Sequence, residues 1–69
     1  MDMNLVRTFV TVYQQNSFTQ AADLLNISQP AVSMSIRRLE SELGVTLFVK
    51  EGRGIAPTAK AVELAEKMQ

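Results

Sequence analysis

Residues 17–33 read SFTQAADLLNISQPAVS, a stretch that carries the start and stop signals of two helices joined by a short turn. Ser17 and Thr19 are alternative caps for the first helix, because a hydroxyl oxygen can accept a hydrogen bond from the first N–H groups of a helix. Asn26 tolerates the left-handed conformation that ends this helix. Ser28 is placed to cap the next one. This order of signals predicts a helix-turn-helix.

The second of the two helices is expected to cover residues 28–43. Pro30 falls in its first turn, where a missing backbone N–H costs nothing, and Gly44 follows as a terminating residue. One face is apolar at spacings of four, three and four residues and consists of Val32, Ile36, Leu39 and Leu43. The opposite face is polar, so this helix can bury one side and present the other to a partner.

Apolar spacing also predicts a helix before this stretch, with Asn4 as its cap and its end near Asn16. Its inward face is expected to consist of Leu5, Val6, Phe9, Val10 and Tyr13. The short helix after Ser17 is expected to direct Ala21, Ala22, Leu24 and Leu25 inward, with Ile27 filling the gap beneath the turn. Its alanines allow another helix to cross it closely.

A β-hairpin is predicted directly after the helix-turn-helix. Residues 45–50 form an extended run, residues 51–54 a turn with two glycines, and residues 55–56 a short return strand. The fold class is therefore mainly α. We expect a winged helix-turn-helix with three helices, a two-stranded β wing and the start of a linker helix.

The last helix follows Thr58, which caps it, and still runs where the sequence stops. Its apolar stripe consists of Ala61, Val62, Leu64, Ala65 and Met68. One interpretation is that this stripe packs on its own domain, at least through its first turn. The other is that it pairs with the same helix of a second chain. We expect a domain over residues 1–58 and a linker over residues 59–69, in a natural chain that continues further.

The composition excludes several classes of protein. With neither cysteine nor histidine, the chain offers no disulfide framework, thiolate site, His-based catalytic triad or metal site. It also has no Gly-rich phosphate loop, so we expect neither an enzyme nor a cofactor. No apolar run approaches the about 20 residues of a transmembrane helix, and no secretory signal follows Met1. We therefore expect a cytoplasmic protein that does not bind or span a membrane.

The charges are balanced in number but not in position. Seven Lys and Arg residues stand against seven Asp and Glu residues. The net charge of zero by itself argues against a nucleic-acid partner. A net positive charge is, however, confined to two segments, residues 27–39 with Arg37 and Arg38 and residues 50–60 with Lys50, Arg53 and Lys60 against Glu51, while the remaining segments are net negative. If the segments meet in space, they form a local basic region. Such a region makes few phosphate contacts, and its binding depends less steeply on salt than that of a strongly basic protein.

The polar face of the helix over residues 28–43 suits the major groove of double-stranded DNA, where the second helix of such a motif places its first residues against base edges. Gln29 can pair bidentately with adenine, and Ser33 can reach a base or a phosphate. Pro30 and Met34 offer apolar atoms to a thymine methyl group. The predicted base-reading residues are therefore Gln29, Pro30, Ser33 and Met34.

Other polar residues are placed to hold the DNA backbone, and the wing over residues 45–56 is expected at the minor groove. The predicted contacts of this kind are Ser17, Thr19, Ser28, Arg37, Arg38, Lys50 and Arg53. For three of the predicted DNA contacts, a purely structural role is the alternative. Arg37 and Arg38 can pair with acidic neighbours on a solvated face, and Met34 can fill the core. A helix-turn-helix used only for protein–protein interaction or dimerisation is the alternative function, and the neutral net charge favours it.

The stretch over residues 17–33 resembles the signature of LysR-type transcriptional regulators. The resemblance continues through residues 36–48, IRRLESELGVTLF, and through Arg53 and residues 57–59, so it covers nearly the whole chain. It implies a winged helix-turn-helix, a linker helix that pairs two chains, and a C-terminal domain, absent here, that senses a small-molecule inducer. It also implies that the base-reading residues other than Met34 meet the major groove. The residue matching Arg53 would lie on the wing beside the minor groove.

This sequence departs from the family pattern in three places. Met34 stands where the family often has arginine, which removes one phosphate or guanine contact. Lys50 replaces a usual arginine and keeps the charge without the planar fork. Pro57 and Lys60 replace the usual leucine and glycine at the start of the linker helix.

Pairing follows from the same resemblance. A symmetric homodimer presents two recognition helices to the two half-sites of an interrupted DNA palindrome. We expect this DNA to be that of the nucleoid. The residues expected to carry dimerisation are Val62, Ala65 and Met68. Because only about three turns of the linker helix are present, we expect this pairing to be weak and concentration-dependent.

Overall fold

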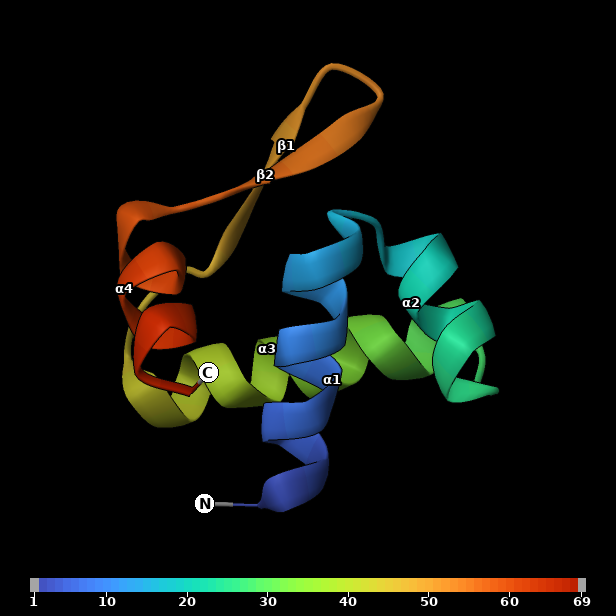
Figure 1. Ribbon diagram of the computed structural model, residues 1–69, viewed down its shortest axis with the longest axis horizontal. Coiled ribbons are helices and arrows are strands. Elements are labelled where there is room, and N and C mark those ends of the chain that lie inside the picture. The colour runs from blue at the N-terminus through green and yellow to red at the C-terminus, as the bar shows by residue number, and fades with distance from the viewer. Residues whose placement is uncertain (1, 69) are drawn as a thin grey trace.

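Four helices and one hairpin make up the computed structural model, which describes residues 2–68 (Figure 1). In chain order the elements are α1 (Met3–Gln15), α2 (Phe18–Leu25), α3 (Gln29–Leu43), β1 (Phe48–Glu51), β2 (Gly54–Pro57) and α4 (Ala59–Met68). The two strands pair antiparallel. The protein is mainly α, and its elements follow one another in the predicted order. No helix within residues 2–68 has the length and apolarity needed to cross a membrane.

The helices begin at side chains that accept their first N–H groups. Ser17 accepts from the backbone N of Gln20 at 3.1 Å, which decides between the two predicted caps of α2. Ser28 and Thr58 cap α3 and α4 in the same way, as predicted. The cap of α1 is Asp2 rather than Asn4, because the Asp2 carboxylate accepts from the backbone N of Asn4 at 2.8 Å. A carboxylate at a helix start also interacts favourably with the helix dipole.

The helix ends use residues that accept a left-handed backbone. Asn16 and Asn26 have φ angles of 49° and 57°, and Gly44 has a φ angle of 69°. Short polar side chains and glycine tolerate this conformation with little steric cost. The Asn26 and Gly44 N–H groups return to carbonyls of α2 and α3, which completes the ends of these helices. The turn between α2 and α3 therefore holds the two helices at a defined angle.

The core is shared by all the helices and the beginning of the wing. In Figure 1, α1 crosses α3 while α2 packs beside both. The buried apolar residues are Leu5, Phe9, Val12, Ala21, Ala22, Val32, Ile36, Leu39, Leu47, Phe48, Ala61 and Ala65. The predicted stripe of α3 is confirmed, with Leu43 half-buried at its end. The alanines of α2 are buried as expected and allow the close approach of α1 and α3.

Two predicted core positions are wrong and one was missed. Leu24 is 63% exposed, because a helix turns by about 100° per residue and Leu24 lies nearly opposite the buried Ala22. Ile27 is 42% exposed, since the chain turns outward after α2. Val12 is fully buried, whereas Val10 and Tyr13 pack at the edge of the core. The position of α3 decides which part of the broad apolar face of α1 lies innermost.

The wing is a hairpin with a two-residue turn. Its register pairs Phe48 with Pro57 and Glu51 with Gly54, which leaves Gly52 and Arg53 at the tip. Gly52 adopts a φ angle of 59°, a conformation that glycine accepts readily. The first strand starts at residue 48 rather than 45. Residues 45–47 instead lead from α3 into the hairpin, and the N–H of Leu47 donates to the Glu40 carboxylate.

Helix α4 packs on its own domain. Ala61 and Ala65 are 0% and 1% exposed, inside the core of the same chain. Val62 and Met68 are half-buried and lie about 60° to either side of Ala65 around the helix. The predicted dimerisation stripe is therefore centred on a residue with no free surface. The role of Ala65 in dimerisation stays a prediction, and in the single chain the domain itself covers this face.

Candidate nucleic-acid interface

A groove of about 500 Å³ runs between the wing, the start of α2 and α3. It collects six of the side chains predicted to contact DNA, namely Ser17, Thr19, Gln29, Arg37, Lys50 and Arg53. These residues come from segments up to 36 positions apart in the sequence, counted from Ser17 to Arg53. The fold thus brings together the two basic segments that the sequence could only place separately.

The groove is a local basic region in a neutral chain. Arg37, Lys50 and Arg53 line it, and none of the described residues along it is acidic. Within residues 2–68, these three cations take part in no ion pair with an acidic side chain. Their charges are therefore available to an anionic partner. A groove with cations on its walls attracts a polyanion more strongly than the net charge suggests.

The first turn of α3 lies at this groove and offers two polar side chains. The Gln29 Nε2 donates to the Ser33 Oγ at 3.3 Å, one helical turn further on. Gln29 is exposed and Ser33 is half-buried. Both side chains can exchange this long hydrogen bond for bonds to a base edge. Because the first turns of α2 and α3 both present N–H groups and a positive dipole end, this region also suits phosphate oxygens.

The remaining predicted residues are spread around the groove. Ser33 lines a smaller adjoining hollow together with Arg37, while Ser28 and Pro30 are exposed at the start of α3. Met34 and Arg38 line a separate hollow beside Leu5, on the side of α3 next to the beginning of α1. Met34 is 70% exposed, so its alternative role as a core residue is wrong. Arg38 pairs with Glu42 at 3.5 Å, an exposed contact that stabilises the helix little.

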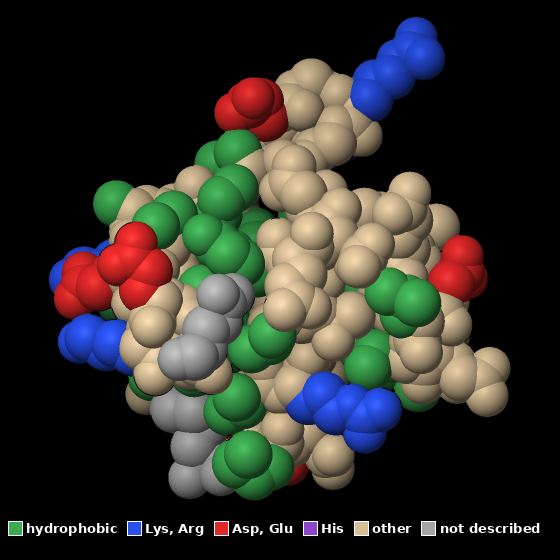
Figure 2. Space-filling view, in the orientation of Figure 1, with side chains coloured by type: hydrophobic (Ala, Val, Ile, Leu, Met, Phe, Trp, Pro, Cys, Tyr) green, Lys and Arg blue, Asp and Glu red, His purple; other side chains and the backbone are tan. Residues whose placement is uncertain are grey.

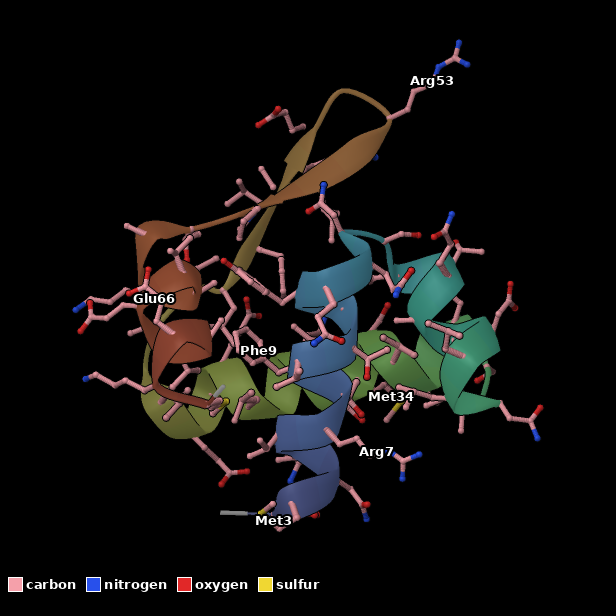
Figure 3. All side chains as sticks on the ribbon, in the orientation of Figure 1. Met3, Arg7, Phe9, Met34, Arg53 and Glu66 are labelled. Atoms are coloured by element: carbon pink, nitrogen blue, oxygen red, sulfur yellow. The ribbon has the colours of Figure 1, made fainter. Side chains whose placement is uncertain are left out.

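At the tip of the wing, Arg53 extends away from the body of the protein (Figure 3). The space-filling view shows a single basic side chain standing clear of the wing at the same place (Figure 2). Over α4, by contrast, acidic and basic side chains lie next to each other, in keeping with the pairs that Glu63 forms with Lys60 at 4.0 Å and Lys67 at 3.7 Å. Within residues 2–68, the cations without an acidic partner are therefore Arg37, Lys50 and Arg53 on the groove and the wing, together with Arg7 on α1.

Three side chains hold the base of the wing, a role that no sequence pattern indicated for any of them. The Glu40 Oε2 accepts from the backbone N of Leu47 at 2.8 Å. The Thr58 hydroxyl donates to the Thr46 carbonyl at 2.6 Å, and its backbone N donates to the Leu47 carbonyl at 2.9 Å. Phe18 packs edge-on against Phe48, with ring centroids 6.0 Å apart. These contacts join residues at least seven positions apart, so periodicity within one element cannot reveal them.

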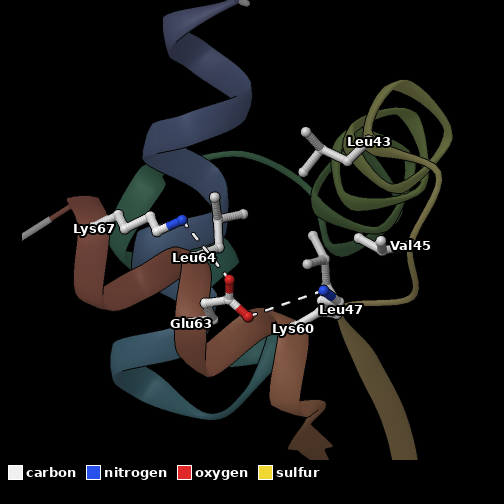
Figure 4. Close-up of a pocket in the computed structure, with 7 residues that line it drawn as sticks. All are labelled: Leu43, Val45, Leu47, Lys60, Glu63, Leu64 and Lys67. Carbon is white, nitrogen blue, oxygen red and sulfur yellow. Dashed lines mark ion pairs between the residues drawn. The ribbon is translucent and has the colours of Figure 1, made fainter.

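A second hollow lies on the other side of the domain, between α4 and the end of α3 (Figure 4). It has a volume of about 180 Å³ and an apolar floor that includes Leu43, Val45 and Leu64. The paired side chains of Lys60, Glu63 and Lys67 form its rim. This surface lacks the free cations of the groove beside the wing.

The fold and the groove together define the class of winged helix-turn-helix proteins, in which a wing follows directly after the recognition helix. Residues 3–62 match the family model described as a bacterial regulatory helix-turn-helix protein of the lysR family. The chain therefore belongs to the LysR family, as its sequence resemblance predicted.

Curated relatives match over a small part of their own length. The HTH-type transcriptional regulator AbaB of Streptomyces antibioticus is 54% identical over 67 residues, which is 97% of this chain and 22% of the relative. The HTH-type transcriptional regulator LeuO of Escherichia coli is 47% identical over 64 residues, or 93% of this chain and 20% of the relative. The chain thus spans about a fifth of these proteins. Both are named as regulators, which confirms the expectation that the chain is not an enzyme.

Solved structures match the fold closely. A LysR-family transcriptional regulator from Eggerthella lenta has a TM-score of 0.93 and 38% sequence identity, over 99% of this chain and 97% of that one. The CbnR_DBD–DNA complex has a TM-score of 0.91 and 31% identity, over 97% of this chain and 77% of that one. The predicted winged helix-turn-helix is confirmed.

Proposed function

We propose that this chain binds double-stranded DNA sequence-specifically, as the reading domain of a LysR-type transcriptional regulator. The observation that carries the proposal is the groove in which Arg37, Lys50 and Arg53 stand without acidic partners beside the first turn of α3. A DNA complex among the structural relatives supports it. The proposed domain covers residues 1–58 and is followed by the linker over residues 59–69, whose first turns also pack into the core of the domain through Ala61 and Ala65.

The proposed roles follow the distance of each side chain from the start of α3. Base edges are read by Gln29, Pro30 and Ser33, with Met34 at the margin of the contact. The DNA backbone and minor groove are held by Ser17, Thr19, Ser28, Arg37, Arg38, Lys50 and Arg53. Arg38 contributes least, because it already pairs with Glu42 and lies outside the groove.

The test begins with selection of bound duplexes from a randomised pool, since the operator is not known. Binding curves are then measured for the selected duplex and for an unrelated duplex of equal length, at several salt concentrations. We expect the selected duplex to bind more tightly and both affinities to fall as salt rises. Absence of measurable binding at low salt would contradict the proposal.

Dimerisation remains part of the proposal, but the proposed contact surface between the two chains is smaller than the sequence predicted. A homodimer on an interrupted palindrome requires a contact outside the buried face of α4. Of the predicted residues, Val62 and Met68 keep free surface, whereas Ala65 does not. We expect weak, concentration-dependent dimerisation, and sedimentation showing a tight dimer at low concentration would contradict it.

The whole regulator is proposed to act in the bacterial cytoplasm, on the nucleoid. A small-molecule inducer would bind a C-terminal domain, because the curated relatives are about five times as long as this chain. This part of the proposal is tested with the full-length protein, by comparing DNA binding with and without candidate inducers.

An interaction module without specific DNA binding is the second candidate function. One observation favours it: the described surface exposes the large apolar side chains of Met3, Leu24, Ile27 and Met34. Exposed apolar groups are common on soluble proteins when they are scattered. The selection experiment separates the two functions, because an interaction module enriches no duplex.

A further inference from the structure

The wing reaches the helix-turn-helix through one buried side chain of its first strand. In β1, Phe48 is buried at 9% exposure, while the three residues after it are exposed. The Phe48 ring lies between two others. Phe9 of α1 packs on it at a centroid distance of 5.8 Å, and Phe18 meets it edge-on at 6.0 Å with an interplanar angle of 88°.

Phe18 occupies a special place among these rings. It is the first residue of α2, directly after the cap Ser17, and it is half-buried. Its side chain lines both the groove beside the wing and the adjoining hollow that contains Ser33 and Arg37. Phe18 therefore contacts the wing while it belongs to the helix-turn-helix. Edge-to-face aromatic pairs have a preferred geometry, so the contact favours one orientation of the wing.

The position of the wing matters because it acts as a lever. Strands rise by about 3.3 Å per residue, so the tip at residues 52–53 lies about 13 Å from Phe48. A tilt of about 10° at Phe48 moves Arg53 by about 2 Å, which is enough to break a hydrogen bond. The side chains of Glu40 and Thr58 bind the backbone of Leu47 and Thr46, directly before the first strand of the wing. They leave the tilt beyond Phe48 less constrained.

We propose that Phe18 is a positioning residue for DNA binding, which holds the wing at the distance from α3 at which Arg53 and Gln29 engage one duplex together. The inference rests on the proposed DNA-binding function. Phe18 itself need not touch DNA. Its effect is carried by Arg53, because a rigid support lets two contacts form without a further loss of conformational freedom.

A double-mutant cycle tests this on the duplex that the wild-type chain selects from a randomised pool. Phe18→Leu is expected to weaken binding about tenfold in the wild-type background, but less than about threefold in the Arg53→Ala background. A general loss of stability lowers affinity equally in both backgrounds. Equal losses in the two backgrounds would overturn the proposal.

A direct measurement of wing motion accompanies the cycle. In the Phe18→Leu variant, nitrogen-15 relaxation at residues 52–54 is expected to show larger fast motions than in the wild-type chain, with α3 unchanged. Unchanged relaxation at the tip would also overturn the proposal. Phe18→Met, which keeps most of the side-chain volume against Phe48, is measured in parallel so that a folded variant is compared.

Tyr13→Leu is the matched control. Tyr13 is also half-buried and packs on Phe9 at 6.1 Å, but it forms no aromatic contact with the wing. The loss of affinity that Tyr13→Leu causes is expected to be the same with and without Arg53→Ala. If the wild-type chain selects no duplex at all, the proposed function fails. If it selects one and the Phe18 cycle is additive, only the role of Phe18 fails.

Discussion

At the scale of single residues, the start of α3 presents a polar side chain that is both exposed and hydrogen-bonded within the helix. Gln29 is exposed yet already hydrogen-bonded to Ser33. The bond is long at 3.3 Å and open to solvent, so it restrains both side chains at little cost when it is exchanged. The amide of Gln29 can therefore exchange this bond for bonds to a base edge.

Gln29→Ala tests the reading of bases. We expect a loss of about 1–3 kcal/mol of binding free energy to the selected duplex and relaxed preference at one base pair. Competition with duplexes that vary one base pair at a time measures both. Gln15→Ala on α1 serves as the control, since Gln15 is not among the residues lining the groove. An undiminished preference at every base pair would contradict the role of Gln29.

Lys50→Ala tests a contact to the backbone instead. Lys50 lines the groove from β1 and has no acidic partner among the described residues. If it meets a phosphate, its loss weakens binding to all duplexes alike and reduces the slope of log affinity against log salt by about one. Lys60→Ala on α4, which already pairs with Glu63, is expected to leave the slope unchanged. Equal slopes for wild type and Lys50→Ala would exclude the phosphate contact.

At the scale of elements, the wing is joined to the helices by a few side-chain contacts near its base. The wing has two short strands, and an isolated two-stranded hairpin is marginally stable in water. Its base is held by the Glu40 carboxylate from α3 and by the Thr58 hydroxyl at the start of α4. The recognition helix and the linker helix thus both fix the place where the wing begins.

Glu40→Ala is expected to destabilise the fold by about 1–3 kcal/mol, because it leaves the partly buried N–H of Leu47 without an acceptor. Glu42→Ala is the matched control. Glu42 has only the exposed pair with Arg38, and its loss is expected to change stability by less than about 0.5 kcal/mol. Urea unfolding of the two variants measures the difference. Equal stabilities of the two variants would contradict the anchoring role of Glu40.

The whole molecule is a small domain with a neutral net charge and one basic face. Three groove cations suggest about three phosphate contacts per chain, and so a slope of about −3 for log affinity against log salt. At this size the domain buries about 60% of its unfolded surface, which leaves little stability to spare. The buried first turns of α4 are therefore part of the domain and more than a spacer.

Ala65→Leu tests whether α4 completes the core. Ala65 is 1% exposed, so a larger side chain is expected to overpack the interior and destabilise the fold by about 1–3 kcal/mol. Ala59→Leu at the exposed start of the same helix is the control, with little change expected. Thermal unfolding measures both, and sedimentation shows whether association changes. A stable Ala65→Leu variant that dimerises more tightly would restore the predicted pairing face.

Local sequence signals predict the elements and their order, because helix caps, left-handed helix ends and turn glycines act within four residues of one another. Ser17, Ser28, Gly44 and Thr58 function where local chemistry predicted. Even locally, the cap of α1 is Asp2 and not Asn4, because the helix begins two residues earlier than predicted, at Met3.

The burial of particular apolar residues and the meeting of cations from distant segments depend instead on how the elements pack. Val12 and Ala65 are buried and Leu24 is exposed, because the burial of each side chain depends on the angle at which another helix crosses its own. The same packing brings Arg37 into the groove with the wing and leaves Arg38 beside Glu42. Contacts between distant segments carry no sequence period. For that reason the sequence did not predict the groove, although six of the residues that line it were predicted to contact DNA.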